Sequence, residues 1–311
     1  MQRENLSAEF LRYHHKFNHA SPKRIQLMAR HGTIPRRLAS CAVPVCTACL
    51  YGKATRRKWR HKSSGNEAES YTPTSPGEVV SVDQMVSPTP GLVAQMSGTL
   101  TIERYKCATI FIDHATDLSF VFLQKTASAE ETVEAKAAFE RYAQEQGVSI
   151  MHYHGDNGVF WSHLWSANCL QKGQGLTFAG VNAHHQNGKA ERRIRELQQT
   201  ARTMLIHAQR RWPSAITTNL WPYAIRIAND MLNATPSLKL KDGKHRHPCS
   251  ADHRCQSILF IGSILDARCM FWPKSYRTRE ESTRSGKNGH KWGSTWVGHL
   301  SMHNRWPWYS A

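Results

Sequence analysis

Hydrophobic and polar positions follow two different periods along the middle of the chain. Short apolar runs predict strands at 78–86, 106–113, 118–124, 148–154 and 175–180. Longer segments with apolar residues three or four positions apart predict helices at 128–147, 187–212 and 220–234. Three successive strands followed by helix and strand units predict an α/β domain, in which a mixed sheet carries helices on its faces.

Capping residues mark the start of two helices. Ser128 is followed three residues later by Glu131, which is the pattern of a capping box, and Gly147 is typical of a helix end. A shorter helix is predicted at 21–32, where Ser21 would be the cap and a proline would occupy the first turn.

The composition is strongly basic. The 311 residues include 41 Lys and Arg against 23 Asp and Glu, a formal charge of +18, and the pI is near 9.8. This excess predicts a polyanionic partner. No apolar run reaches the roughly 18 to 20 residues of a membrane span, and the start lacks the apolar stretch of a signal peptide. We therefore expect an intracellular protein without a membrane partner, whose eight Cys are thiols or metal ligands.

Composition divides the chain into four segments. Residues 1–52 are rich in His, Cys and Arg, and 53–78 form a basic linker with Ser, Pro and Gly. Residues 79–235 hold the predicted sheet. In 236–311 periodicity is lost, and this irregular basic tail is interpreted either as a nucleic-acid-binding segment or as a degraded or frameshifted reading, of which we favour the second.

Two histidines and two cysteines in the first segment have the spacing of a metal site. His14 and His19 have four residues between them, Cys46 and Cys49 have two, and 26 residues separate the pairs. Imidazoles and thiolates suit tetrahedral zinc, which can hold together a segment too short to bury a core. The sequence thus predicts one structural Zn2+ in a small domain. His15 and Cys41 lie close enough to compete as ligands, and this choice stays open.

The stretch HGDNGVF places Asp156 directly after a predicted strand. Asp-Asn-Gly is a favourable turn sequence, so a turn alone would explain this residue. Asp83, however, lies inside a Val-rich strand, where an unpaired carboxylate is costly to bury and indicates a cation. Glu191 opens the helix after a Gln-Asn-Gly turn, where complementing the helix dipole is the simpler interpretation. Asp113 is a fourth acidic residue at a strand end, and we assign it to a turn.

In chain order, these motifs resemble those of the retroviral-type integrases, especially the integrase region of Ty1/copia-like retrotransposons. YHHKFNH and CTACLYGK resemble the family's zinc-binding His-His-Cys-Cys segment. SVDQM and HGDNGVF resemble the motifs of its first two catalytic aspartates, and HHQNGKAERRIREL resembles its Gln-Asn-Gly-x-Ala-Glu motif. The resemblance covers roughly residues 10–235.

This resemblance implies an RNase H-like fold with a five-stranded mixed sheet and flanking helices, preceded by a small helical zinc-binding domain. The catalytic triad that it implies consists of Asp83, Asp156 and Glu191. The zinc ligands that it implies are His14, His19, Cys46 and Cys49. The triad would hold two Mg2+ or Mn2+ ions, which suit phosphodiester displacement. The implied reactions are cleavage near the 3′ end of element DNA and transfer of that end to target DNA.

Basic and polar residues near the triad are candidates for DNA contacts. Arg195 and Gln198 share the face of Glu191 on the predicted helix, and Lys189 and Arg192 flank them. The linker holds a basic cluster that is expected to contact phosphates without sequence preference. Its first members are Arg56, Arg57 and Lys58. A solvated basic surface is the alternative for all of these residues.

Two classes of function stay open. The first is a DNA strand-transferring integrase that acts as a homo-oligomer on element ends and target DNA, in the nucleus or in a cytoplasmic particle. The second is a catalytically silent, zinc-containing remnant of a retrotransposon polyprotein, which binds DNA or RNA. A nuclease that cuts without joining would share the metal site. The intact triad favours the integrase, whereas the irregular tail favours the remnant.

Overall fold

The computed structural model describes residues 5–55, 73–94, 101–179 and 187–236. All of the described residues belong to one compact unit. The predicted tail beyond residue 236 lies outside them, as do linker residues 56–72 with the candidate DNA contacts Arg56, Arg57 and Lys58. Among the described helices, none is both long and apolar enough to cross a membrane.

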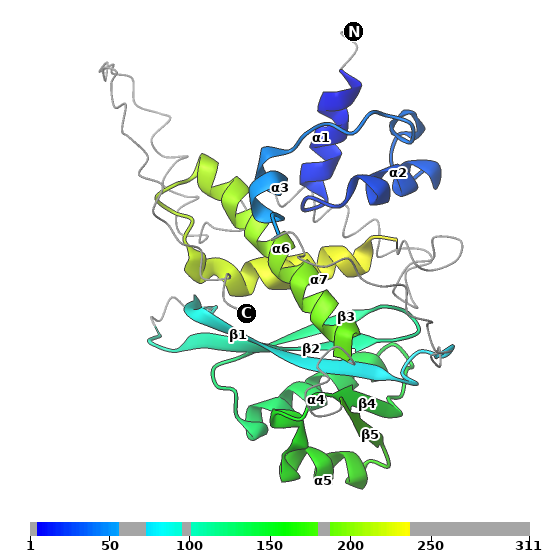
Figure 1. The fold of residues 1–311 in the computed structure, drawn as a ribbon, viewed down its shortest axis with the longest axis vertical. Helices are drawn as coiled ribbons and strands as arrows, with labels where there is room; N and C mark the ends of the chain where they lie inside the picture. Colours follow the sequence, from blue (N-terminus) through cyan, green and yellow to red (C-terminus); the bar gives the residue numbers. More distant parts are fainter. Residues whose placement is uncertain (1–4, 56–72, 95–100, 180–186, 237–311) are drawn as a thin grey trace, which may run out of the picture. The chain divides into compact units, whose positions relative to one another are not determined.

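A five-stranded mixed sheet forms the centre of the described fold, with strand order β3-β2-β1-β4-β5 (Figure 1). Its strands are β1 Val80–Leu92, β2 Arg104–Asp113, β3 Ser119–Gln124, β4 His152–Gly155 and β5 Gly175–Phe178. The first three strands pair antiparallel, and β4 and β5 continue the sheet parallel to β1. This arrangement confirms the predicted five-stranded mixed sheet.

Helices cover both faces of the sheet (Figure 1). On one face lie α4 Ala129–Gln144 and α5 His163–Gln171, and on the other lie α6 Gly188–Arg211 and α7 Trp221–Ala234. Against α4 and α5, the apolar side chains Val82, Phe111, Phe139 and Trp165 are buried in one core. The predicted cap of α4 is confirmed, because the Ser128 side chain accepts a hydrogen bond from the backbone N–H of Glu131.

Among the described residues, three α-helices precede the sheet. They are α1 Leu6–Lys16, α2 Pro22–Arg30 and α3 Thr47–Gly52. Helix α3 lies beside α6 (Figure 1), and the approach is close at Gly52, where an added Cβ would meet Thr203 Oγ1 at 2.1 Å. Arg202 Nε also donates a hydrogen bond to the Gly52 carbonyl at 2.7 Å. The absence of a side chain at Gly52 therefore permits the contact between the N-terminal helices and α6.

Two of the strands differ from their predicted form. The strand predicted at 148–154 begins only at His152, because Met151 donates its N–H to the Gly77 carbonyl, before the paired segment starts. Alternation along β1 predicts Val86 on the same face as Val82, yet Val86 is 64% exposed. The register of β1 against β2 becomes irregular after Val86, and Thr89 beyond this point accepts a hydrogen bond from Trp221 at the start of α7.

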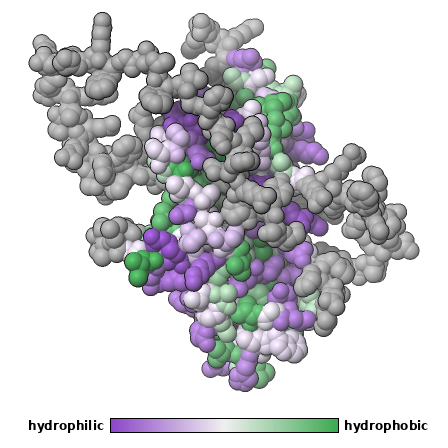
Figure 2. Space-filling model, turned by 60° about the vertical axis from the view of Figure 1, so that its left-hand side comes forward, coloured by the Kyte–Doolittle hydropathy of each residue, from purple (hydrophilic) through white to green (hydrophobic). Residues whose placement is uncertain are grey.

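The described surface mixes hydrophilic and hydrophobic side chains on the face drawn in Figure 2. Large exposed apolar residues such as Ile102 and Leu170 come from different parts of the chain. Scattered apolar residues of this kind are normal on protein surfaces. The chemistry of the molecule is therefore expected at its polar clusters.

Candidate active site and candidate metal centre

Asp83 and Asp156 occupy matching positions on neighbouring strands. In the parallel pairing of β1 with β4, Ser81 lies opposite His154. Continuing this register by two residues places Asp83 level with Asp156, which directly follows the end of β4. Both side chains are partly buried. The fold thus brings two carboxylate-bearing positions together at one end of the central strands.

The turn interpretation of Asp156 also holds locally. Its Oδ1 accepts a hydrogen bond from the backbone N–H of Gly158 at 3.1 Å, and the neighbouring Asn157 donates to the Ala179 carbonyl at 3.0 Å. Asp83 Oδ1 accepts from the Gln84 N–H at 2.7 Å. An ionised carboxylate offers about four acceptor sites on two oxygens. A backbone hydrogen bond on one oxygen is therefore compatible with a metal on the same carboxylate.

Glu191 lies in the first turn of α6, and the start of this helix is anchored beside Asp83. Asn187, which precedes the helix, donates a hydrogen bond from Nδ2 to the carbonyl of Val82 at 3.0 Å. Lys189 Nζ donates to the His114 carbonyl at 2.8 Å. Glu191 is partly buried. The third predicted carboxylate is thus held on a helix whose start is hydrogen-bonded to the strand of the first.

A buried ion pair strengthens the same anchor. Arg193 is 4% exposed, and its Nη2 lies 2.8 Å from Asp117 Oδ1 and 3.0 Å from the Asp117 carbonyl. Asp117 has a φ of 61° in the turn between β2 and β3. Arg193, which lies next to the candidate DNA contact Arg192, is therefore engaged within the fold.

The strands and the helix that carry the three acidic residues lie together, but the carboxylate oxygens of these residues do not converge. Asp83, Asp156 and Glu191 do not form a group whose ligand atoms all lie within 4.8 Å of one another in the described part of the chain. Three negative charges without a cation repel one another. The assignment of these residues as metal ligands stays a prediction.

The remaining acidic candidate, Asp113, has the hydrogen bonds of a turn residue. It is 4% exposed. Its Oδ2 accepts from the backbone N–H and the hydroxyl of Thr116 at 2.7 and 2.6 Å, and its Oδ1 accepts from the Gly77 N–H at 3.0 Å. These contacts agree with the turn that the sequence predicts.

The candidate DNA contacts on α6 differ in exposure. Arg192 and Arg195 are exposed, whereas Gln198 and Lys189 are partly buried. Because Lys189 already donates to the His114 carbonyl, it has a structural role beside any contact with DNA. The two exposed arginines are the ones best placed to meet a phosphate.

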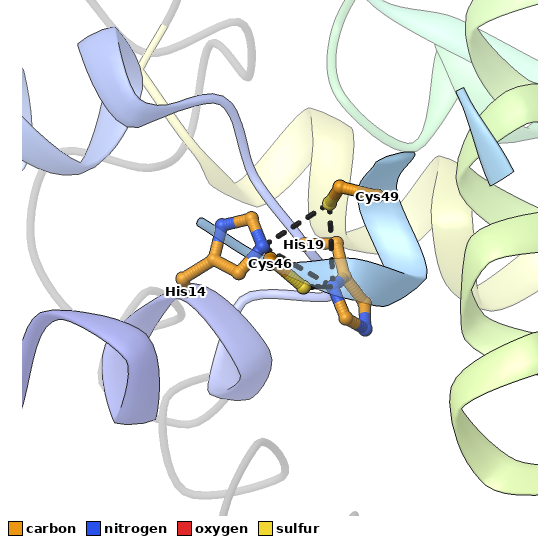
Figure 3. Close-up of side chains that lie close together, drawn as sticks. All are labelled: His14, His19, Cys46 and Cys49. Carbon is orange, nitrogen blue, oxygen red and sulfur yellow. Dashed lines mark hydrogen bonds between the residues drawn. The ribbon is translucent and has the colours of Figure 1, made fainter. Parts of the chain in front are cut away.

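Four nitrogen and sulfur atoms converge between α1 and α3 (Figure 3). His14 Nε2 lies 3.2 Å from both Cys49 Sγ and His19 Nδ1. His19 Nδ1 lies 3.4 Å from Cys46 Sγ and 3.5 Å from Cys49 Sγ. Zinc bonds of about 2.0–2.1 Å to nitrogen and about 2.3 Å to sulfur give tetrahedral edges of about 3.3–3.8 Å. The donor set and its spacing therefore fit Zn2+.

The local backbone explains how His14 and His19 meet. Helix α1 ends at Lys16, and the next turn contains two left-handed residues, Asn18 with φ 50° and His19 with φ 59°. The His19 N–H donates to the His14 carbonyl at 2.8 Å. Left-handed conformations are uncommon outside glycine, although Asn and His adopt them more often than most residues. This turn folds the second histidine back onto the first.

Burial sets the protonation of these ligands. It lowers the pKa of His14, and it lowers the pKa of His19 to about 2, so both imidazoles are neutral and able to bind a metal. Burial also raises the pKa of Cys49 to about 11. A buried thiolate is therefore unfavourable without a cation beside it, and Zn2+ would supply that charge.

The two residues that compete as zinc ligands, Cys41 and His15, lie differently with respect to the candidate site. Cys41 is not among the residues that converge with His14, and its thiol donates to the Ala42 carbonyl at 3.3 Å. His15 stays close, with Nε2 at 3.6 Å from Cys46 Sγ. Burial, followed by the charges of His207 and His14, lowers the pKa of His15 to about 4.

Two residues at these sites were not among the predicted ones. His207 of α6 contacts His19 over a separation of 188 positions, and no local pattern could have indicated this. Asn187 belongs to the Gln-Asn-Gly motif that introduces α6, so the motif marked its position but not its hydrogen bond to Val82.

Comparison with known proteins finds a retrotransposon relative. No family model matches the chain. The chain is 24% identical over 227 residues to the "Retrovirus-related Pol polyprotein from transposon RE1" of Arabidopsis thaliana. The match covers 72% of this chain and only 14% of that polyprotein.

Similar solved structures include two viral proteins. One is the HTLV-2 integrase catalytic core domain in complex with magnesium, at 19% identity and a TM-score of 0.37, covering 55% of this chain and 94% of that one. The other is a simian T-cell lymphotropic virus intasome in complex with a PP2A regulatory subunit, at 15% identity and a TM-score of 0.42. This match covers 79% of this chain and 75% of that one. The sequence match confirms the resemblance to a retrotransposon protein that the motifs predict, and the chain is similar to part of this transposon polyprotein.

Proposed function

We propose that the chain is an integrase-type polynucleotidyl transferase that cleaves near the 3′ end of element DNA and joins this end to target DNA. The observation that carries the proposal is the parallel register of β1 and β4, whose continuation places Asp83 level with Asp156, next to the anchored helix of Glu191. The match to a transposon polyprotein supports it.

Asp83, Asp156 and Glu191 would hold two Mg2+ or Mn2+ ions, since hard divalent cations prefer carboxylate oxygens. When bound, such a pair of ions stabilises the attacking and leaving oxygens of an in-line phosphodiester displacement. The chain contributes rigidity, because Asp83 lies within the sheet and Asn187 fixes the start of α6 to β1. Arg192 and Arg195, which are exposed on α6, would hold DNA phosphates near the triad.

The N-terminal helices would be held by one structural zinc ion. His14, His19, Cys46 and Cys49 supply two imidazoles and two sulfurs, the donor set of a closed structural site. A structural metal ion would stabilise this part of the chain, because its helices α2 and α3 have only 9 and 6 residues and can bury little apolar surface.

The partners follow from the reaction. DNA is the proposed substrate, both as element ends and as target, and the charge of +18 favours such a polyanion. A homo-oligomer would bring two DNA ends to one target, in the nucleus or in a cytoplasmic particle. RNA binding belongs to the alternative of a silent remnant.

A strand-transfer assay tests this proposal. Purified full-length chain is incubated with a labelled DNA end, a supercoiled plasmid and Mg2+ or Mn2+. The integrase function predicts labelled DNA joined to plasmid, and it predicts that Glu191→Gln loses this product while Glu134→Gln, which alters an exposed glutamate of α4, keeps it. Cut but unjoined DNA would indicate a nuclease. DNA binding with no cutting would indicate a silent remnant.

A further inference from the structure

His207 of α6 lies within hydrogen-bonding distance of a candidate zinc ligand. Its Nδ1 is 2.9 Å from Nε2 of His19, and the two ring planes meet at 73°. His19 is 2% exposed, and His207 is partly buried. The contact joins the N-terminal helices to a helix of the catalytic fold.

The zinc site determines the direction of this hydrogen bond. His19 Nδ1 is the nitrogen that faces the sulfurs of Cys46 and Cys49, so it is the atom that would bind the metal. A neutral imidazole carries one N–H. Metal on Nδ1 therefore leaves the proton on Nε2, and His19 donates to Nδ1 of His207.

His14 shows the same arrangement with a different acceptor. Its Nε2 faces Cys49, and its Nδ1 lies 2.9 Å from the Ala20 carbonyl, to which it would donate. Each imidazole of the candidate site thus has one nitrogen toward the metal position and the other on a fixed acceptor. In metal sites, such outer partners set the tautomer and orientation of the ligand.

We propose that His207 is a positioning residue of the zinc site, and that its hydrogen bond to His19 couples zinc binding to the docking of α6. This inference rests on the zinc site proposed above. Loss of an outer partner typically lowers metal affinity by about 10–100-fold. By linkage, bound zinc stabilises the contact with α6 by the same factor.

The coupling reaches the helix of the triad. Glu191 and His207 are 16 positions apart on α6, which corresponds to about 24 Å at about 1.5 Å per residue. Arg202, which lies between these two residues, donates a hydrogen bond to the Gly52 carbonyl. Arg210, which follows His207, donates one to the hydroxyl of Thr47. The second half of α6 therefore contacts the N-terminal segment that carries the candidate zinc ligands.

A second metal ion is the competing explanation. Ligand atoms of His15, His19 and His207 also lie within 4.8 Å of one another. The 2.9 Å separation of His19 and His207, however, is a hydrogen-bond length and is shorter than the edge of about 3.3 Å between two nitrogens on one zinc ion. The geometry favours the hydrogen bond.

Zinc affinity of the full-length chain tests the proposal, measured by competition with a chromophoric chelator. We expect His207→Leu to lower the affinity by about 10–100-fold. His207→Asn should stay near the parent value, because its amide oxygen can occupy the position of Nδ1. His163→Leu, which removes an exposed imidazole from α5, is the matched control and should have no effect. Should His207→Leu fail to fold, His207→Gln replaces it, since its longer side chain places the acceptor elsewhere.

Hydrogen exchange supplies a readout of the coupling. Zinc removal should increase amide exchange in the second half of α6 in the parent and in His207→Asn, and change it much less in His207→Leu. Equal zinc affinity in the parent and His207→Leu would overturn the inference while leaving the zinc site intact. Two zinc ions per parent chain, falling to one in His207→Leu, would also overturn it in favour of a second metal site. A parent chain that binds no zinc would overturn both the site and the inference.

Discussion

Asn187 Nδ2 donates a hydrogen bond to the carbonyl of Val82 at 3.0 Å, which joins the residue before α6 to the residue before Asp83. Asn187 is 3% exposed, and among the described residues its Oδ1 is buried without a partner. Of the contacts that anchor α6, this one lies nearest in sequence to Asp83, and it helps to position Glu191 relative to that aspartate. It is therefore expected to matter for metal binding more than for the fold.

Substitution Asn187→Ala leaves the Val82 carbonyl unpaired, which costs about 1–3 kcal/mol of unfolding free energy. We expect slower strand transfer and a higher Mg2+ concentration for half-maximal activity, because Glu191 is no longer held beside Asp83. Asn168→Ala is the control, since it removes a hydrogen bond from Lys136 on the opposite face of the sheet. An unchanged Mg2+ dependence in Asn187→Ala would contradict the positioning role.

Zinc content tests the four converging donors. We expect about one zinc per chain, and its removal by a chelator should unfold α1 to α3 while the sheet stays folded. Hydrogen exchange of residues 5–55 and metal analysis measure these effects. Cys46→Ser combined with His19→Ala should abolish zinc binding, whereas Cys41→Ser should keep it, because this thiol donates to a backbone carbonyl instead. Zinc retained by the double variant would show that His15 or Cys41 serves as a ligand.

Stability at low pH should depend on Glu140, whose side chain is 14% exposed. Burial raises its pKa, but hydrogen bonds from Lys136, Lys172 and Gln174 outweigh this and lower the pKa to about 2. Since the native pKa lies below the ordinary value of 4.5, the ionised form stabilises the fold. A shift of this size corresponds to about 3 kcal/mol, present in full above pH 4.5 and lost as the pH falls toward 2.

The variant Glu140→Gln checks this expectation. Its unfolding free energy should lie below that of the parent at pH 6, and the difference should shrink as the pH falls from about 5 to about 2. Denaturant unfolding at a series of pH values measures it, with the exposed Glu134→Gln as control. A difference that is constant with pH would show that the charge of Glu140 does not stabilise the fold.

DNA affinity should be mainly electrostatic, falling steeply between about 50 and 200 mM salt and differing little among sequences. Arg192→Ala with Arg195→Ala should weaken binding to all sequences alike and reduce the salt slope by about 0.9 for each lost phosphate contact. Arg141→Ala, which removes one exposed arginine of α4, is the control for the loss of a positive charge elsewhere on the surface. Equal slopes for the double variant and the parent would exclude these arginines from the DNA contact.

Local sequence patterns predicted most of the described sheet and its larger helices. Short, mainly apolar runs mark β1, β2 and β3, and a capping pattern marks the start of α4, because these signals arise within single elements. Helix α5 was missed, since apolar residues occur on both of its sides: Trp165 and Cys169 are buried, whereas Leu164 and Leu170 are exposed. The first strand residue of β4 was placed too early, because Met151 donates its N–H to the Gly77 carbonyl outside the paired segment.

For the candidate sites, the sequence predicted the residue types that meet but not all of the contacts between them. Motif spacing predicted that His14, His19, Cys46 and Cys49 would meet, since the residue types themselves indicate a metal. It could not indicate His207, because a contact between distant elements leaves no local pattern. The convergence of the three carboxylates depends on side-chain orientation and on bound cations, which neither motif spacing nor backbone register determines.

The most direct test of the proposed function is the effect of Asp156→Asn on DNA cutting and joining, with Mg2+ and with Mn2+. An amide of similar volume keeps an acceptor for the Gly158 N–H but weakens metal binding. We predict loss of nearly all cutting and joining, with zinc content and DNA affinity close to those of the parent. Asp113→Asn, the control, should lose stability through its turn hydrogen bonds but keep activity below its unfolding temperature. An active parent whose Asp156→Asn variant retains activity would contradict the metal role and leave Asp156 as a turn residue.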